Sequence, residues 1–85
     1  MSAVDYAHLV GKYVSMSRPW RPGDHPDDRA GIGGEGVIAV VVDNPEGVSI
    51  CFDYGMGFVV SRDGDEWSFA IWPDEATRKE WRNIR

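Results

Sequence analysis

The chain has 85 residues, one cysteine, and fourteen acidic against nine basic side chains, which gives a formal charge of −5. This length accommodates one domain, 1–85, and a single cysteine excludes an internal disulfide. Acidic charge spread along the chain, without clustered lysine or arginine, disfavours nonspecific binding to nucleic acid phosphates.

A short helix and a first strand are expected at the start of the chain. A capping pattern at Ser2 and apolar residues at helical spacing predict a helix over 1–10. Alternation then predicts a strand over 12–17, with Val14 and Met16 on one face. The segment 1–10 lacks the pattern of a signal peptide, and no apolar run approaches the roughly 18 residues of a membrane span. A cytoplasmic protein without a membrane segment is therefore expected.

The segment 18–35 has no periodicity and reads as a long loop. It contains three prolines, a cluster of acidic residues and several glycines. Loops of this length inside compact domains are uncommon and are often functional. The loop 18–35 is therefore the expected site of function.

Four more strands follow, over 36–43, 48–54, 58–62 and 66–72, joined by turns at 44–47, 55–57 and 63–65. The strand 36–43 is apolar on both faces, which predicts a central strand buried on both sides. The next and the last strands each show one apolar face; these faces are formed by Val48, Ile50, Phe52 and Tyr54, and by Trp67, Phe69 and Ile71.

A C-terminal helix is predicted over 73–84. Pro73 suits the first helical position, and opposite charges four residues apart support the helix at Asp74–Arg78 and Glu75–Lys79. An apolar stripe of Thr77, Trp81 and Ile84 is expected to dock on an open end of the sheet.

The strand pattern predicts a mainly β fold, either a small five-stranded barrel or a strongly bent antiparallel sheet, with a short helix at each end. The glycine-hydrophobic pattern at Gly36-Val37, Val48 to Phe52 and Asp53-Tyr54-Gly55 resembles SH3-like small barrels, including the KOW type, over 12–72. An OB-like barrel or a small open sheet suits the same pattern. The resemblance implies that the loop 18–35 shapes a ligand surface. The chain departs from the family in lacking an acidic-aromatic signature for proline-rich peptides and the basic surface of a KOW domain.

No cofactor, metal or catalytic group is expected. Oxygens of three aspartates and one imidazole nitrogen in the loop suit a divalent cation, but a solvated acidic loop explains them better; these residues are Asp24, His25, Asp27 and Asp28. The glycines of 31–36 lead into a strand, whereas phosphate-binding loops lead into a helix, and they are interpreted as a flexible entry to that strand. Cys51 has no cationic neighbour in its strand to activate it. The chain is therefore not expected to be an enzyme.

Protein binding is the leading functional hypothesis. Arginine and tryptophan dominate interface hot spots, and the loop carries such residues together; the predicted partner-binding set is Arg18, Trp20, Arg21, Asp24 and Arg29. The indole of Trp20 either plugs one end of the barrel or faces a partner. The other tryptophans, at 67, 72 and 81, are expected in the core or against the helix.

The hypothesis is a non-enzymatic module that binds a host or cellular protein through the loop. Arginine-rich, leucine-poor composition is typical of GC-rich genomes and suggests a bacterial or bacteriophage accessory factor. Nucleic-acid binding by an SH3-like or KOW-like face is the alternative, and net charge disfavours it. A second alternative is acidic mimicry of nucleic acid through the aspartates Asp24, Asp27, Asp28, Asp43, Asp63 and Asp65. Self-association through an unpaired edge strand is also compatible with this sequence.

Overall fold

A computed structural model of the chain describes residues 2–61 and 66–83, with the backbone alone for 81–83. Its elements are η1 (Ala3–Leu9), β1 (Tyr13–Arg18), η2 (Pro26–Asp28), β2 (Ile32–Asn44), β3 (Gly47–Phe52), β4 (Gly57–Ser61), β5 (Ser68–Trp72) and α1 (Glu75–Asn83), where η marks a 3-10 helix. The expected turn at 63–65, the side chain of Trp81 and Ile84 lie outside this description.

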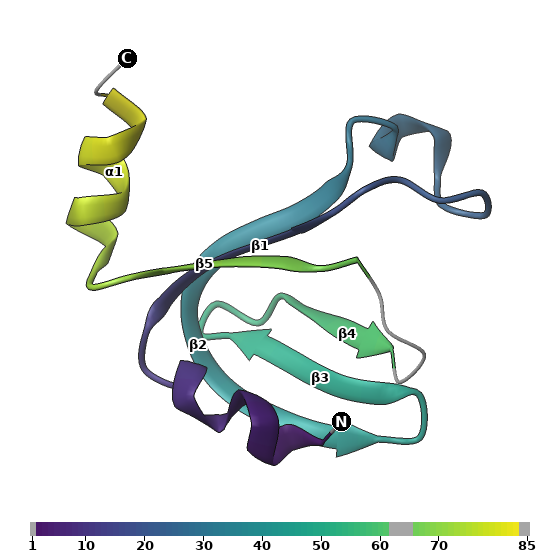
Figure 1. Ribbon diagram of the computed structural model, residues 1–85, viewed down its shortest axis with the longest axis horizontal. Helices are drawn as coiled ribbons and strands as arrows, with labels where there is room; N and C mark the ends of the chain where they lie inside the picture. Colours follow the sequence, from purple (N-terminus) through teal and green to yellow (C-terminus); the bar gives the residue numbers. More distant parts are fainter. Residues whose placement is uncertain (1, 62–65, 84–85) are drawn as a thin grey trace.

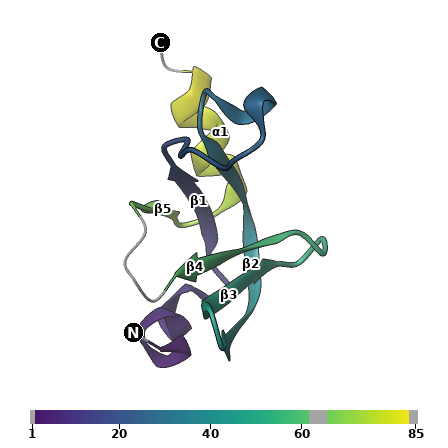
Figure 2. The ribbon, with the colours of Figure 1, turned by 90° about the vertical axis from the view of Figure 1, so that its right-hand side faces the viewer.

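The five strands form one antiparallel sheet in the order β4-β3-β2-β1-β5, which confirms the mainly β fold with a helix near each end. Figure 1 shows β2 curving strongly, so that β3 and β4 face β1 and β5. η1 and α1 lie at opposite ends of the molecule in Figure 1 and in Figure 2. Among the described residues, no helix has the length and apolar character needed to cross a membrane.

The long strand β2 joins the two parts of the sheet. Its residues 32–37 pair with β1, and its residues 38–44 pair with β3. The register shifts between Ile38 and Val40, so that Ala39 forms a bulge. The central position is confirmed, but burial on both faces is wrong, because Val40 and Val42 beyond the bulge are 45 % and 49 % exposed.

The glycine-rich segment before residue 36 belongs to β2, so the predicted loop 18–35 ends earlier, at Gly31. These glycines allow neighbouring backbone and side chains to pack closely against β2, whereas a flexible entry to the strand was expected. A Cβ at Gly33 would overlap the backbone oxygen of Met16, and one at Gly36 would lie 2.6 Å from the ring of Tyr54. Loop chemistry and close strand packing both favour glycine, which explains the error.

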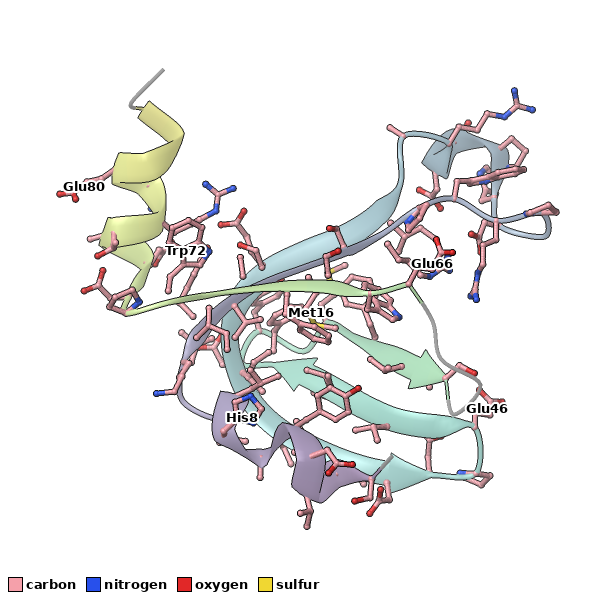
Figure 3. All side chains as sticks on the ribbon, in the orientation of Figure 1. His8, Met16, Glu46, Glu66, Trp72 and Glu80 are labelled. Atoms are coloured by element: carbon pink, nitrogen blue, oxygen red, sulfur yellow. The ribbon has the colours of Figure 1, made fainter. Side chains whose placement is uncertain are left out.

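The core lies between the two parts of the sheet, where Figure 3 places Met16. It consists of Leu9, Val14, Met16, Ile38, Val48, Ile50, Phe52 and Val60. The predicted apolar face of β3 is thus confirmed except at Tyr54, which lies beyond the end of β3 and is 56 % exposed. Tyr54 stacks on Phe52 at 5.4 Å and donates a hydrogen bond to the backbone oxygen of Glu35 at 2.8 Å.

The predicted face of the last strand is confirmed in part. Trp67, just before β5, and Phe69 pack against the core, whereas Ile71 is 46 % exposed. Ile71 pairs with the buried Val14, but β5 is an edge strand of the described sheet, so only one of its sides is flanked by another strand.

α1 begins at Glu75 rather than at Pro73. The carboxylate of Asp74 accepts a hydrogen bond of 2.7 Å from the backbone N–H of Thr77 and thereby caps the helix. The Glu75–Lys79 pair is confirmed at 3.1 Å, but Arg78 turns away from Asp74 toward the sheet. A polar contact from Arg78 thus joins the helix to the sheet, and the expected apolar stripe is not tested, because two of its three side chains lie outside the described residues.

Candidate partner-binding loop

The loop between β1 and β2 spans 19–31 and projects beyond the sheet, as Figure 1 shows. It contains the single turn η2, which a hydrogen bond from the backbone N–H of Asp28 to the backbone oxygen of His25 closes at 2.9 Å. A second turn follows, in which the backbone N–H of Gly31 donates to the backbone oxygen of Asp28 at 2.8 Å. Gly23 and Gly31 adopt φ values of 106° and 118°, a region that favours glycine. The chain therefore reverses direction at defined positions.

Arg18 and Asp24 fasten the base of this loop to each other. Two guanidinium nitrogens of Arg18 donate to the two carboxylate oxygens of Asp24 at 2.8 and 3.1 Å. Asp24 also accepts a 2.8 Å hydrogen bond from the backbone N–H of Arg21. The Arg18 guanidinium lies 5.7 Å from the ring centre of Trp67, which ties the pair to the sheet.

Little of this ion pair is open to solvent. The side chains of Arg18 and Asp24 are 10 % and 17 % exposed. The hydrogen bonds from Arg18 and from the Arg21 backbone lower the pKa of Asp24 to about 2, so that its carboxylate stays charged at neutral pH. The two side chains contact each other and thereby hold the loop in shape.

Trp20 and Arg29 meet on the outer part of the loop. The indole N–H of Trp20 donates to the backbone oxygen of His25 at 3.1 Å, and the Arg29 guanidinium lies 5.8 Å from the ring centre. Trp20 is half-buried against its own loop, while Arg21 and Arg29 are exposed. Trp20 contacts its own loop rather than filling one end of the sheet, and its contact with a partner stays a prediction.

The four candidate metal ligands of the loop do not converge. Asp24 binds Arg18, and the Nδ1 atom of His25 accepts a 3.1 Å hydrogen bond from the backbone of Asp27. Across residues 2–61 and 66–80, no group of three His, Cys, Asp or Glu side chains is placed to hold a metal ion.

A pocket of about 390 Å³ opens at the base of the loop. Its lining is small and neutral apart from Arg18, and includes Ser17, Pro19, Ala30, Gly31, Gly33 and Ser68. Because Asp24 neutralises Arg18, the pocket suits an uncharged group with an apolar body and a hydrogen-bonding tip. No pattern in the sequence indicates this pocket, since its lining residues Ser17, Gly33 and Ser68 come together only through strand pairing.

A polar cluster on the outer face of the sheet also lacks a sequence signal. The carboxylate of Glu35 accepts a hydrogen bond from the hydroxyl of Tyr13 at 2.7 Å and lies 3.4 Å from Arg78. Ser15 accepts hydrogen bonds from Trp72 at 3.1 Å and from Arg78 at 3.3 Å. These residues come from distant parts of the chain and meet through strand pairing. Figure 3 shows Trp72 beside α1, where this cluster holds the helix.

Comparisons with protein-family models, curated proteins and solved structures find no match to this chain.

Proposed function

We propose that this chain is a small non-enzymatic module that binds a cellular protein through the loop 19–31. The observation that carries the proposal is a projecting loop fastened by its own side chains. Preorganisation of this kind lowers the ordering cost of binding. Arg18, Asp24, Trp20 and His25 do not belong to the buried core, so we attribute their contacts to the shape of the loop.

Within this proposal, the exposed arginines and Trp20 form the contact surface. Arg21 and Arg29 offer planar donors to a partner, and Trp20 offers a large apolar area that a partner completes. Arg18 and Asp24, in the predicted partner-binding set, act as supports beneath this surface. The neutral pocket beside them suits an uncharged anchor side chain, such as a tyrosine, of the partner.

A protein partner is favoured over nucleic acid because of the charges on the loop. Residues 18–31 hold three arginines and three aspartates, and one of each forms the Arg18–Asp24 pair, so the loop has no excess of basic groups. Phosphate binding needs an excess of basic groups along one surface. The proposed setting is the cytoplasm of a bacterium or an infected cell, where the module acts as an accessory factor.

Affinity capture with loop variants tests this proposal. Purified wild-type chain and the double variant Arg21→Ala/Arg29→Ala are immobilised and exposed to bacterial lysate, and the bound proteins are identified by mass spectrometry. The matched control is Lys79→Ala, which removes an exposed basic group from α1. The proposal expects a partner that is retained by wild type and by the control and is depleted at least tenfold on the double variant. Equal recovery on all three would overturn it.

A second measurement separates the nucleic-acid alternative. Fluorescence anisotropy with labelled single-stranded DNA and RNA at low salt is expected to show no binding that weakens as salt rises. Salt-sensitive binding that needs Arg21 and Arg29 would replace the protein-binding proposal.

A further inference from the structure

The outer face of the sheet holds a site for one guanidinium group, and Arg78 of α1 fills it. The Glu35 carboxylate lies 3.4 Å from a guanidinium nitrogen of Arg78, and Ser15 accepts a 3.3 Å hydrogen bond from the Nε atom. The guanidinium carbon lies 5.4 Å from the ring centre of Trp72. A carboxylate, a hydroxyl and an aromatic ring together match the charge, the donors and the flat face of an arginine side chain. We call Ser15, Glu35 and Trp72 the arginine site.

The strands hold these three residues in place without using the helix. Pairing of β1 with β2 sets Ser15 opposite Glu35. The buried Tyr13 donates a 2.7 Å hydrogen bond to one carboxylate oxygen of Glu35, while the other oxygen faces Arg78. The indole N–H of Trp72 donates to Ser15 at 3.1 Å. Because these contacts join strand residues to each other, the arginine site is expected to keep its shape when Arg78 leaves.

The helix that supplies Arg78 is short and stands partly away from the sheet. α1 has nine residues, which is too few for a stable isolated helix. Figure 1 shows its far end clear of the strands. The side chains of Arg78 and Glu35 are 22 % and 26 % exposed, so that water reaches their ion pair. Exchange of Arg78 for another arginine therefore needs only a local movement of α1.

The present occupant indicates the chemistry of a ligand for this site. A lysine carries its charge on a compact ammonium, which cannot lie flat on Trp72 and reach both Glu35 and Ser15 as a guanidinium does. The chain carries a net charge of −5, which favours a basic partner. Ser17 is on the same face of β1 as Ser15, two residues farther along, and lines the neutral pocket. A protein segment that places an arginine on the site thus passes close to a second cavity.

We propose that the arginine site binds an arginine side chain of a partner protein in competition with Arg78. In the chain alone, α1 fills the site; a partner's arginine takes the same contacts and releases the helix. The tethered Arg78 lowers the apparent affinity for an outside arginine, because only the fraction of molecules with an open site can bind. The proposal does not depend on the loop 19–31.

A small probe and a chain with an open site test the proposal. Arg78→Ala is titrated with N-acetyl-arginine amide at constant ionic strength, and the indole N–H of Trp72 is followed by NMR. A saturable shift is expected, and wild type is expected to need at least tenfold more probe. The matched control Lys79→Ala, which keeps Arg78, is expected to behave like wild type.

Two comparisons test the specificity of the site. N-acetyl-lysine amide is expected to bind Arg78→Ala at least tenfold more weakly than the arginine probe. Adding Glu35→Gln to Arg78→Ala is expected to weaken binding of the arginine probe at least tenfold, since the carboxylate charge is lost.

Circular dichroism verifies that each variant is folded, and Arg78→Gln replaces Arg78→Ala if that variant is not. The absence of a saturable shift in the folded Arg78 variant would overturn the proposal. Equal affinity for wild type and the Arg78 variant, or for the arginine and lysine probes, would also overturn it, as would unchanged binding after Glu35→Gln. The outcome is separate from that of the capture experiment, in which Arg21 and Arg29 are changed and the arginine site stays intact.

Discussion

Arg18 and Asp24 meet through two parallel hydrogen bonds of 2.8 and 3.1 Å, and this pair determines the path of the loop that follows β1. Paired geometry of this kind needs both donors of a planar guanidinium. Arg18→Lys keeps the positive charge but cannot make both parallel hydrogen bonds to Asp24. We therefore expect this substitution to loosen the loop. Amide hydrogen exchange over 19–31 is expected to accelerate at least threefold in Arg18→Lys. Asp28→Asn, in the exposed turn η2, serves as the control, and equal exchange in the two variants would argue against this role.

The same pair makes the loop sensitive to acid. The folded-state pKa of Asp24, about 2, lies below its ordinary value of 3.8, so the pair stabilises the loop fully above about pH 4 and less as the pH falls toward 2. NMR titration of the Asp24 carboxyl is expected to give a midpoint near 2 in wild type. In Arg18→Gln the midpoint is expected to move up toward 3.8. A wild-type midpoint at the ordinary value would contradict the paired geometry.

Gly33 is expected to tolerate no side chain. A Cβ there overlaps the backbone oxygen of Met16, which has no room to move within the paired strands. Gly33→Ala is expected to lower the free energy of unfolding by about 1–3 kcal/mol, as overpacking does. The neighbouring Gly34→Ala places its Cβ 3.3 Å from the side chain of Phe58, which shifts more easily, and serves as the control. Urea denaturation of the two variants measures the difference; an equal loss in both would contradict the account of Gly33.

The C-terminal helix depends on Glu35 and Arg78. Their contact at 3.4 Å, with the hydrogen bond from Arg78 to Ser15, holds a helix that is too short to be stable alone. Arg78→Ala is therefore expected to accelerate hydrogen exchange of the α1 backbone while exchange in β3 stays unchanged. Lys79→Ala removes the exposed pair to Glu75 and is expected to change α1 much less. Similar exchange in the two variants would show that another contact holds the helix.

Local patterns predicted the strands well. Alternation located β1, β3 and β5 to within one or two residues, and the apolar face at Val48, Ile50 and Phe52 is the centre of the core. The alternation of apolar and polar residues indicates which side chains of a strand face inward. It predicted these positions correctly wherever the strand is regular.

The errors occur where nonlocal packing decides. The bulge at Ala39 changes which face of β2 points inward, and no residue near it signals the change. Gly33 was predicted to lie in a loop because the atom that leaves no room for a side chain there, the backbone oxygen of Met16, belongs to another strand. The partner-binding role of Trp20, Arg21 and Arg29 stays a prediction. The pairing of Arg18 with Asp24 depends on a turn whose geometry the sequence does not specify.

The pairing of β1 with β5 has a consequence for how the chain folds. Tyr13 near the beginning of the sheet pairs with Trp72 near its end, and every β1–β5 pair spans most of the chain. Contacts of such long range carry a large loop-closure cost and slow the folding rate. Synthesis on the ribosome adds a further delay, because β1 can pair with β5, its second neighbour in the sheet, only after the other described strands have been synthesised. The β4–β3–β2 meander is able to assemble first, and docking of β5 completes the sheet.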